Sequence, residues 1–232
     1  MSPTPQRNDA EVILEGNSIY PNYTLEKQKS KVLYHVIKRA MDLIFAIIGL
    51  VMLIPVFIIV SVSIKLEDPK GSVFFCQTRI GKDEKPFRMY KFRSMVSNAE
   101  ELLEKLLEQN EISGAMFKMK EDPRITNIGK FIRKTSIDEL PQLWNVVRGE
   151  MSLVGPRPAL PREVNQYSTF EKLRLQVTPG CTGLWQVSGR NNLSFQEMLK
   201  LDLEYIQQRN LWLDVKLILR TVKIILLPNA AY

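Results

Sequence analysis

The feature that most constrains this chain is an uncharged apolar segment near its N-terminus. No charged residue occurs among the 22 residues 43–64, within KRAMDLIFAIIGLVMLIPVFIIVSVSIK. At about 1.5 Å per residue, a helix of this length covers the roughly 30 Å hydrocarbon core of a bilayer. Few soluble proteins bury a helix that is apolar on every face for so long. The segment therefore predicts a membrane helix.

Both flanks of this segment are basic. Lys38 and Arg39 precede it and Lys65 follows it, whereas a one-way span usually shows an asymmetry of positive charge. Pro55 stands in the middle, where it removes a backbone hydrogen bond and bends a helix. A helix that enters the membrane, breaks at Pro55 and returns to the same face satisfies both facts, and a kinked span is the alternative. Asp42, at the edge of the segment, should pair with Lys38 or Arg39.

The rest of the chain predicts an α+β fold that is mainly helical. SVFFCQTRIG and FRMYKFRSM are β-rich runs separated by GKDEKP, which predicts a hairpin. The EDPRITNIGK and MSLVGPRPALP segments predict irregular structure, because proline and glycine punctuate them. The C-terminal LWLDVKLILRTVKIILLP predicts a basic amphipathic helix, suited either to a lipid interface or to ordinary packing. Further helices are expected at 97–112, 140–147, 163–176 and 194–209.

Composition narrows the chemistry. The chain has 232 residues, a net charge of +7 and a sequence pI near 9.4, which favour a polyanionic partner such as nucleic acid, anionic lipid or a phosphorylated substrate. Its mean hydropathy of −0.11 is that of a soluble protein, although one apolar run can hide in such an average. His35 is the single histidine, and Cys76 and Cys181 lie far apart. These counts exclude a Cys/His zinc site and argue strongly against a Ser-His-Asp triad. Any catalysis must then use carboxylates, basic side chains or an oxygen-bound metal.

Asp138 and Glu139 form a carboxylate pair in a basic neighbourhood. In one interpretation Asp138 caps the following helix, with Pro141 in its first turn. In the other, the two carboxylates bind a hard cation while one of them attacks as a nucleophile. Mg²⁺ typically takes one or two protein carboxylates and completes its shell with phosphate oxygens and water.

Four basic residues could hold a diphosphate near this pair. They are Lys91 and Arg93 in YKFRSM, Arg133 before the pair, and Arg157 between two prolines in VGPRP. A guanidinium suits bidentate grips on phosphate, and flanking prolines would hold Arg157 in place at low entropic cost. These side chains matter only if the fold brings them together.

The segments KRAMDLIFA…P, FCQTRIGKDEKPFRMYKFRSM, IRKTSIDELPQLWNVVRGEMSLVGPRP and TPGCTGLWQVSGRN resemble the bacterial sugar transferase family, the monotopic polyprenyl-phosphate phosphoglycosyl transferases. The resemblance runs from about Lys38 to Leu226. It implies transfer of a sugar 1-phosphate, commonly of a hexose, from a UDP-sugar to undecaprenyl phosphate with release of UMP. The resemblance implies that Asp138 is the nucleophile and that Glu139 binds Mg²⁺. It also implies that Lys91, Arg133 and Arg157 bind phosphate. Lys38 and Arg39 are then expected near lipid phosphate, and the membrane helix is expected to break at Pro55. Ile54 stands where family members often have serine.

Together these observations predict a monotopic membrane protein with three parts. A polar arm (1–30) precedes a re-entrant membrane helix (31–66) and a cytosolic catalytic domain with an interfacial C-terminal helix (67–232). The predicted partners are a UDP-sugar, undecaprenyl phosphate and membrane lipids, and a homodimer is one option. Nucleic acid is not expected as a partner, because no nucleic-acid-binding signature is found. The expected location is the bacterial inner membrane, with the site on its cytoplasmic face. The alternatives are a glycosyltransferase that releases UDP and a membrane-anchored scaffold.

Overall fold

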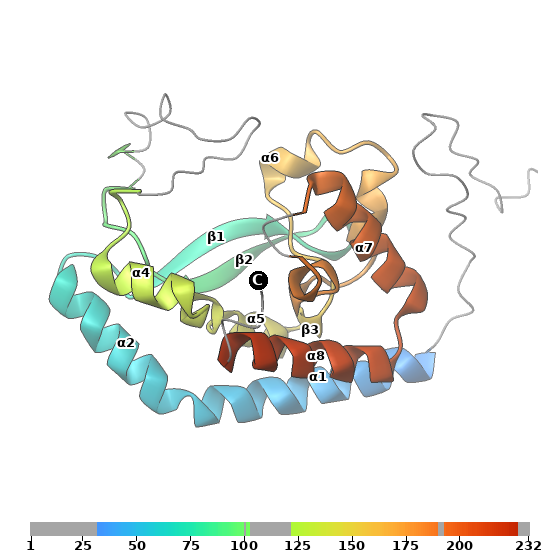
Figure 1. Ribbon diagram of the computed structural model, residues 1–232, viewed down its shortest axis with the longest axis horizontal. Helices are drawn as coiled ribbons and strands as arrows, with labels where there is room; N and C mark the ends of the chain where they lie inside the picture. The colour runs from blue at the N-terminus through green and yellow to red at the C-terminus, as the bar shows by residue number, and fades with distance from the viewer. Residues whose placement is uncertain (1–31, 100, 103–121, 190–192, 227–232) are drawn as a thin grey trace, which may run out of the picture.

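A computed structural model describes residues 32–99, 101–102, 122–189 and 193–226 (Figure 1). The described chain is mainly helical with two small two-stranded sheets, as the sequence predicts. The predicted polar arm (1–30) and most of the predicted helix 97–112 lie outside the described residues.

The uncharged segment forms two helices. α1 (Val32–Met52) and α2 (Ile54–Glu67) are bent by 58° about Leu53, with Pro55 in the first turn of α2. The missing N–H of Pro55 falls among the donors that a helix start leaves unpaired in any case. The break therefore begins two residues before the proline. By length and composition, no one helix of the described residues could cross a membrane, whereas the bent pair meets that criterion together.

The predicted hairpin is confirmed. β1 (Phe74–Ile80) pairs antiparallel with β2 (Pro86–Phe92), with Phe74 opposite Phe92 and Ile80 opposite Pro86. A short 3-10 turn, η1 (Lys82–Glu84), connects the two strands. The β-rich composition of the two runs and the polar connection between them were sufficient to locate both strands.

Two segments that the sequence predicts to be irregular contain regular structure. α4 (Asn127–Lys134) begins inside EDPRITNIGK, where the Thr126 hydroxyl accepts the Gly129 N–H at 2.9 Å and caps the helix. β3 (Ser152–Val154) precedes the prolines of MSLVGPRPALP and pairs in parallel with β4 (Gly180–Thr182). Ser152 of β3 and its partner Gly180 of β4 are 28 residues apart in the sequence, and no local pattern reveals such a contact.

The C-terminal half agrees more closely with the predictions. α5 (Gln142–Arg148), α7 (Phe195–Gln208) and α8 (Leu211–Leu226) fall where helices are expected. Ser194 and Glu197 form a capping box at the start of α7. The predicted helix 163–176 is instead two short pieces, α6 (Pro161–Val164) and η4 (Glu171–Gln176), and η5 (Trp185–Val187) follows β4.

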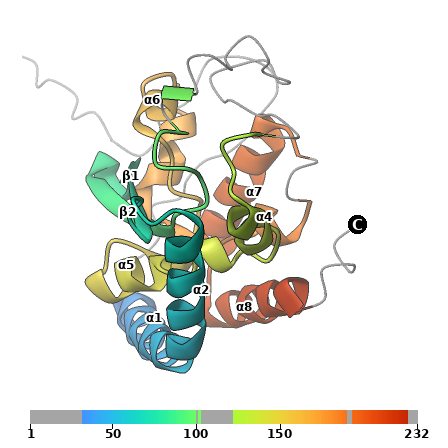
Figure 2. The same ribbon diagram turned by 90° about the vertical axis from the view of Figure 1, so that its left-hand side faces the viewer.

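Three helices occupy one side of the molecule. Figures 1 and 2 show α1, α2 and α8 along this side, while the β1–β2 hairpin and α6 lie away from it. Many large apolar side chains of these helices are exposed, including Met52 on α1, Ile59 on α2 and Trp212 on α8, which are 75%, 66% and 75% exposed. Because large contiguous patches of exposed apolar side chains are rare on soluble monomers, the face is a candidate membrane contact.

Two buried clusters lie between this side and the hairpin, while a third packs α7 and α8 against β3. One cluster joins Ala46 of α1 with Met89 of β2 and Val146 of α5, and a second joins Val60 of α2 with Phe92 of β2. β2 therefore packs against both halves of the bent helix pair. This packing fixes the strand that carries Lys91.

Candidate active site

The Asp138–Glu139 pair lies in a tight turn between two helices. α4 ends at Lys134, Ser136 adopts a left-handed conformation with φ of 58°, and the 3-10 turn η3 (Ile137–Glu139) follows. α5 then begins without a side-chain cap, its N-cap position being Pro141. The interpretation of Asp138 as a helix cap is therefore wrong, and its carboxylate serves no capping role.

Glu139 is paired with the strand next to it. Lys91 Nζ donates to Glu139 Oε1 at 2.6 Å, and these side chains are 19% and 40% exposed. The neighbouring backbone of β2 is held by Asn145, which is fully buried. Its Oδ1 accepts the Tyr90 N–H at 3.0 Å and its Nδ2 donates to the Arg88 carbonyl at 2.7 Å. The Asn145 amide thus acts as a strand partner for β2 immediately before Lys91.

A small cavity of about 40 Å³ adjoins Glu139 and Lys91. Arg79 from β1 and Arg157 from the VGPRP loop also line it. It therefore collects three basic side chains around one carboxylate. Its remaining lining residues are Met89, Gln142, Pro158, Gly180, Cys181 and Gln186. Asp138 does not line the cavity but adjoins it through Glu139 and is only 9% exposed.

The loop that carries Arg157 is fixed by backbone contacts. Gly155 N donates to the Thr182 carbonyl and Gly180 N to the Pro156 carbonyl, both at 2.8 Å. A Cβ at Gly180 would lie 2.0 Å from the Gly155 nitrogen, so only glycine permits this approach. On the other side, Arg79 Nη1 donates to the Pro158 carbonyl at 3.1 Å. The position of Arg157 thus depends on backbone packing rather than on its own side-chain contacts.

Burial and charge set the protonation of the pair. Burial raises the pKa of Asp138 to about 6, with Glu139 adding to the rise and Lys91 and Arg133 opposing it. For Glu139, burial acts to raise the pKa, but Lys91, followed by Arg157 and Arg79, brings it below its usual value. Near neutral pH both carboxylates are therefore ionised for most of the time.

The other groups of the cavity complete this picture. Burial lowers the pKa of the Arg79 guanidinium to about 10, so it remains protonated at neutral pH. Burial raises the pKa of the Cys181 thiol well above its usual range, which leaves this thiol protonated. Since a thiol attacks as the thiolate, Cys181 is a poor nucleophile and the carboxylates are the better candidates.

The structure brings together some, but not all, of the phosphate-binding candidates. Lys91 and Arg157 meet at the cavity, and Arg133, in the last turn of α4, acts on Asp138 through its charge. Arg93 does not line the cavity, and its Nη2 donates to Ser72 Oγ at 2.7 Å. Arg93 therefore contacts the loop before β1 rather than the pair.

Lys38 and Arg39 both contact protein groups. Lys38 Nζ and the Tyr34 hydroxyl donate to Asp214 Oδ2 at 3.0 and 3.1 Å, and the Tyr205 hydroxyl donates to Asp214 Oδ1 at 2.7 Å. Asp214 lies on α8 and is fully buried. This carboxylate joins α1, α7 and α8, and we call Tyr34, Lys38, Tyr205 and Asp214 the Asp214 network.

Asp42 does not form the ion pair that the sequence predicts. Its Oδ1 accepts the Leu153 N–H at 3.1 Å, and Lys38 pairs with Asp214 instead. Arg39 binds the C-terminal end of α5, where its two Nη atoms donate to the Val146 and Val147 carbonyls at 2.6 and 2.8 Å. These carbonyls are among those that a helix end leaves without an internal partner.

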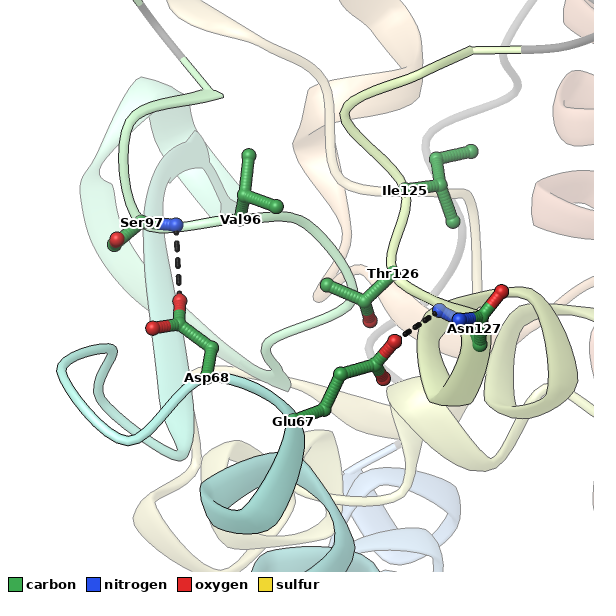
Figure 3. A pocket seen from close by; sticks show the side chains of 7 residues that line it. All are labelled: Glu67, Asp68, Val96, Ser97, Ile125, Thr126 and Asn127. Carbon is green, nitrogen blue, oxygen red and sulfur yellow. Dashed lines mark hydrogen bonds between the residues drawn. The ribbon is translucent and has the colours of Figure 1, made fainter.

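A separate hollow at the end of α2 is built differently (Figure 3). It measures about 440 Å³, and two carboxylates but no basic residue line it. Glu67 accepts the Asn127 and Ile128 N–H groups at 2.7 and 2.9 Å, and Asp68 accepts the Ser97 N–H at 3.1 Å. Glu67 thus anchors the start of α4 to α2 and supports the helix that carries Arg133, whereas Asp68 holds the segment after β2 at Ser97.

The pair has donors suited to a metal ion, but not a complete set. Among the described ranges, no group of three or more His, Cys, Asp or Glu side chains is arranged to hold a metal. Asp138 and Glu139 offer adjacent carboxylates, and Mg²⁺ commonly takes only one or two of these together with phosphate oxygens. A magnesium ion at this pair would therefore need phosphate oxygens and water to complete its shell, and Glu139 would have to share its carboxylate with Lys91.

Sequence reasoning missed three polar residues at the cavity, Arg79, Gln142 and Gln186. Arg79 and Gln142 are buried, being 5% and 4% exposed. Alternation gives no signal for Arg79, because Phe75 and Gln77 on the same face of β1 are exposed and half-buried. No local pattern marks Gln142 or Gln186.

Comparison with known proteins assigns the chain to a family. A profile described as bacterial sugar transferase matches residues 33–228. The chain belongs to the bacterial sugar transferase family. Relatives include a galactosyl transferase CpsE from Streptococcus agalactiae, 48% identical over 84% of this chain and 43% of that protein. Another is an undecaprenyl-phosphate galactose phosphotransferase from Salmonella typhimurium, 41% identical over 90% of this chain and 43% of that protein.

The family members differ in length. This chain spans less than half the length of the two relatives just described. By contrast, it matches 88% of the exopolysaccharide production protein ExoY of Rhizobium meliloti, at 38% identity over 84% of this chain. The residues that the family profile matches, 33–228, contain the Asp138–Glu139 pair, the cavity, α2 and all but the first residue of α1.

Proposed function

We propose that this chain transfers a hexose 1-phosphate from a UDP-sugar to undecaprenyl phosphate and releases UMP. The observation that carries the proposal is the convergence of Lys91, Arg79 and Arg157 beside the Asp138–Glu139 pair, in a chain of the bacterial sugar transferase family. Relatives named undecaprenyl-phosphate galactose and glucose phosphotransferases support the substrate class. The relative named exopolysaccharide production protein supports a role in bacterial polysaccharide synthesis.

The first proposed step uses Asp138 as a nucleophile. A carboxylate oxygen of Asp138 attacks the β-phosphorus of the UDP-sugar, and the bond from this phosphorus to the bridging oxygen breaks. UMP leaves with that oxygen and its electron pair, while the sugar phosphate becomes an acyl phosphate on Asp138. Arg79, Arg157 and Lys91 supply positive charge where the leaving phosphate gains negative charge.

The second proposed step returns Asp138 to its starting state. An oxygen of undecaprenyl phosphate attacks the same phosphorus, and the bond to the Asp138 oxygen breaks. The product is an undecaprenyl diphosphate sugar. A covalent intermediate lets one site serve a soluble donor and a lipid acceptor in turn, which predicts ping-pong kinetics. Asp138 and Glu139 are the proposed ligands of a Mg²⁺ ion, which when bound supplies further positive charge for the diphosphate.

We also propose that the exposed apolar side formed by α1, α2 and α8 lies in the inner membrane, with the site on the cytoplasmic face. The bend of 58° is compatible with a helix pair that enters and leaves on one side. Exposed basic residues on α8, Lys216, Arg220 and Lys223, suit the headgroup region of anionic lipids.

The deciding experiment measures UMP and UDP released from a panel of UDP-hexoses with undecaprenyl phosphate and Mg²⁺. Sustained UMP release that requires undecaprenyl phosphate, with at most about one UMP per protein released by the donor alone, supports the proposal. UDP release would indicate a glycosyltransferase, and no release with any donor would favour a scaffold. Asp138→Asn should abolish both turnover and labelling of the protein by a donor with a radioactive β-phosphate. Glu204→Gln on α7, a carboxylate that does not line the cavity, is the matched control and should retain both. Persistent turnover in Asp138→Asn would disprove the nucleophile assignment.

A further inference from the structure

Gln142 places a buried side-chain amide at the cavity beside Glu139. It is the first residue of α5, it is only 4% exposed, and it lines the cavity. Within the described residues, neither its amide nitrogen nor its amide oxygen has a hydrogen-bond partner. Buried polar groups are almost always hydrogen-bonded, and an unpaired one destabilises the folded protein. The amide is therefore available to a group that the cavity takes from outside.

The volume of the cavity limits what can enter it. It measures about 40 Å³, whereas one water occupies roughly 30 Å³ in the liquid. A sugar ring, a uracil ring and a whole phosphate group each contain several atoms of that size and do not fit. The cavity can therefore take a single oxygen atom of a larger ligand.

The charges around the cavity favour an anionic oxygen. Lys91 is paired at 2.6 Å with Glu139, the one acidic side chain among the described lining residues. Arg79 and Arg157 also line the cavity, and neither forms an ion pair in the part of the chain that the structure describes. After burial, the charge of Arg157 contributes to the lowered pKa of Arg79. An anion at the cavity would balance these two guanidinium charges.

The amide of Gln142 adds a neutral donor to these charges. Lysine and arginine side chains offer only hydrogen-bond donors, so they can serve the amide oxygen of Gln142 but not its nitrogen. The carboxylate of Glu139 already accepts from Lys91. The amide nitrogen of Gln142 therefore needs an acceptor oxygen that a ligand brings.

We propose that the amide nitrogen of Gln142 donates to a non-bridging oxygen of the α-phosphate of the UDP-sugar, and that this oxygen occupies the cavity. The inference rests on the proposed transfer reaction, in which Asp138 attacks the β-phosphorus. Asp138 adjoins the cavity without lining it, so the neighbouring α-phosphate lies at the cavity itself. This phosphate leaves as part of UMP and gains negative charge. Gln142 is thus a further donor-binding residue that stabilises the leaving group without adding a charge.

Two substitutions of Gln142 separate this contact from a structural role. Gln142→Met keeps the length of the side chain but removes the amide, and it should weaken UDP binding about tenfold or more, as expected when a hydrogen bond to a charged group is lost. Because the lost amide is buried and unpaired, this variant should melt at or above the wild-type temperature. Gln142→Glu places a carboxylate beside the α-phosphate and should weaken UDP binding roughly a hundredfold. Gln166→Met changes an exposed glutamine that does not line the cavity, and this matched control should bind UDP as the wild type does.

Sulfur-substituted nucleotides test the contact directly. Binding of radiolabelled UDP to the full-length protein is measured in detergent with Mg²⁺, with the two diastereomers of UDP that carry sulfur at the α-phosphorus as competitors. Sulfur is larger than oxygen and a weaker acceptor, so the diastereomer that places sulfur in the cavity should compete about tenfold less well with the wild type. Gln142→Met should reduce this preference about threefold or more. A bound Mg²⁺ has a preference of its own, but it acts equally on the wild type and the variant.

Weaker UDP binding and a smaller sulfur preference in Gln142→Met, without a lower melting temperature, support the proposal. An unchanged preference between the diastereomers would overturn it. Tight UDP binding by Gln142→Glu would also overturn it, because a carboxylate there can accept from a hydroxyl but repels a phosphate oxygen. A clear fall in the melting temperature of Gln142→Met would instead give the amide a structural role. These three results leave the proposed function standing as long as the wild type binds UDP, whereas a wild type that binds no UDP would overturn the donor site and this inference together.

Discussion

Replacing Asp214 with leucine should destabilise the protein more than most single changes can. Asp214 is fully buried, and the Lys38 side chain that pairs with it is only 13% exposed. The variant leaves the Lys38 ammonium and the Tyr34 hydroxyl without their acceptor, whereas the Tyr205 hydroxyl keeps the Val154 carbonyl at 3.1 Å. Breaking a buried pair by removing one partner costs about 3–5 kcal/mol, mainly because the remaining charge is uncompensated.

The lower end of that range applies here. Lys38 has a long side chain and is partly exposed, so some of its hydration can be recovered, and we expect about 3 kcal/mol. For a protein of this size, each kcal/mol lowers the melting temperature by roughly 2–4 °C, which gives a decrease of about 6–12 °C. The double variant Lys38→Met/Asp214→Leu removes both charges and should recover most of this loss.

Thermal unfolding of the two variants and the wild type, followed by circular dichroism in detergent, gives the comparison. Tyr205→Phe serves as the control that removes one hydroxyl donor and should cost only about 1 kcal/mol. If Asp214→Leu melts within 2 °C of the wild type, or if the double variant is no more stable than the single one, the reasoning about the buried charge is refuted. Transfer activity adds a second reading. Full activity in the stable double variant would give Lys38 a structural role, whereas a hundredfold loss would instead place it at the acceptor phosphate.

Three further predictions concern the site. Asn145→Leu removes the amide that pairs with β2 and should lower the free energy of unfolding by about 3 kcal/mol, as measured by thermal unfolding. Its UMP release should also fall further than that of Lys91→Gln when the two variants are compared at matched stability. Burial raises the pKa of Asp138 to about 6, so ionising this carboxyl in the folded protein lowers the free energy of unfolding. The loss is absent below about pH 4, where the group is protonated in both states, and complete above about pH 6. Asp138→Asn should therefore raise stability at pH 7 by about 2 kcal/mol, and the wild-type rate should fall as pH drops through 6; equal melting temperatures for the two proteins at pH 7 would contradict this. Gly180→Ala should prevent the Gly155 approach and yield little folded protein, as judged by expression and gel filtration, whereas normal yield would show that the loop can shift.

The sequence was informative where a pattern is local. Two β-rich runs with a polar connection located the strands of the hairpin, and the helix expected at 194–209 agrees with α7. Asp138, Glu139, Lys91 and Arg157 could be chosen because carboxylates and basic residues in short motifs limit the available chemistry. The break between α1 and α2 was predicted from Pro55, although the helix bends at Leu53.

Contacts between distant segments could not be predicted in the same way. The Lys38 partner lies 176 residues away at Asp214, so the local choice of Asp42 as its partner was wrong. β3 escaped prediction because its three residues pair with Gly180–Thr182 and not with a neighbour in sequence. Arg93 and Lys91 are two residues apart on the same motif, yet only Lys91 reaches the cavity, since the strand ends at Phe92.

The Arg39 contact gives the molecule a mechanical property. Through Val146 and Val147, Arg39 joins α1 to the end of α5, while the start of α5 follows directly from the Asp138–Glu139 turn. The seven residues of α5 form a lever about 10 Å long. A tilt of α1 by about 10° would then displace the catalytic turn by about 2 Å, enough to change a rate by a hundredfold or more. If α1 lies in a bilayer as proposed, the thickness and curvature of that bilayer would set its tilt and so the rate of the proposed reaction. A bilayer of unsuitable thickness would then slow the reaction without any ligand being bound.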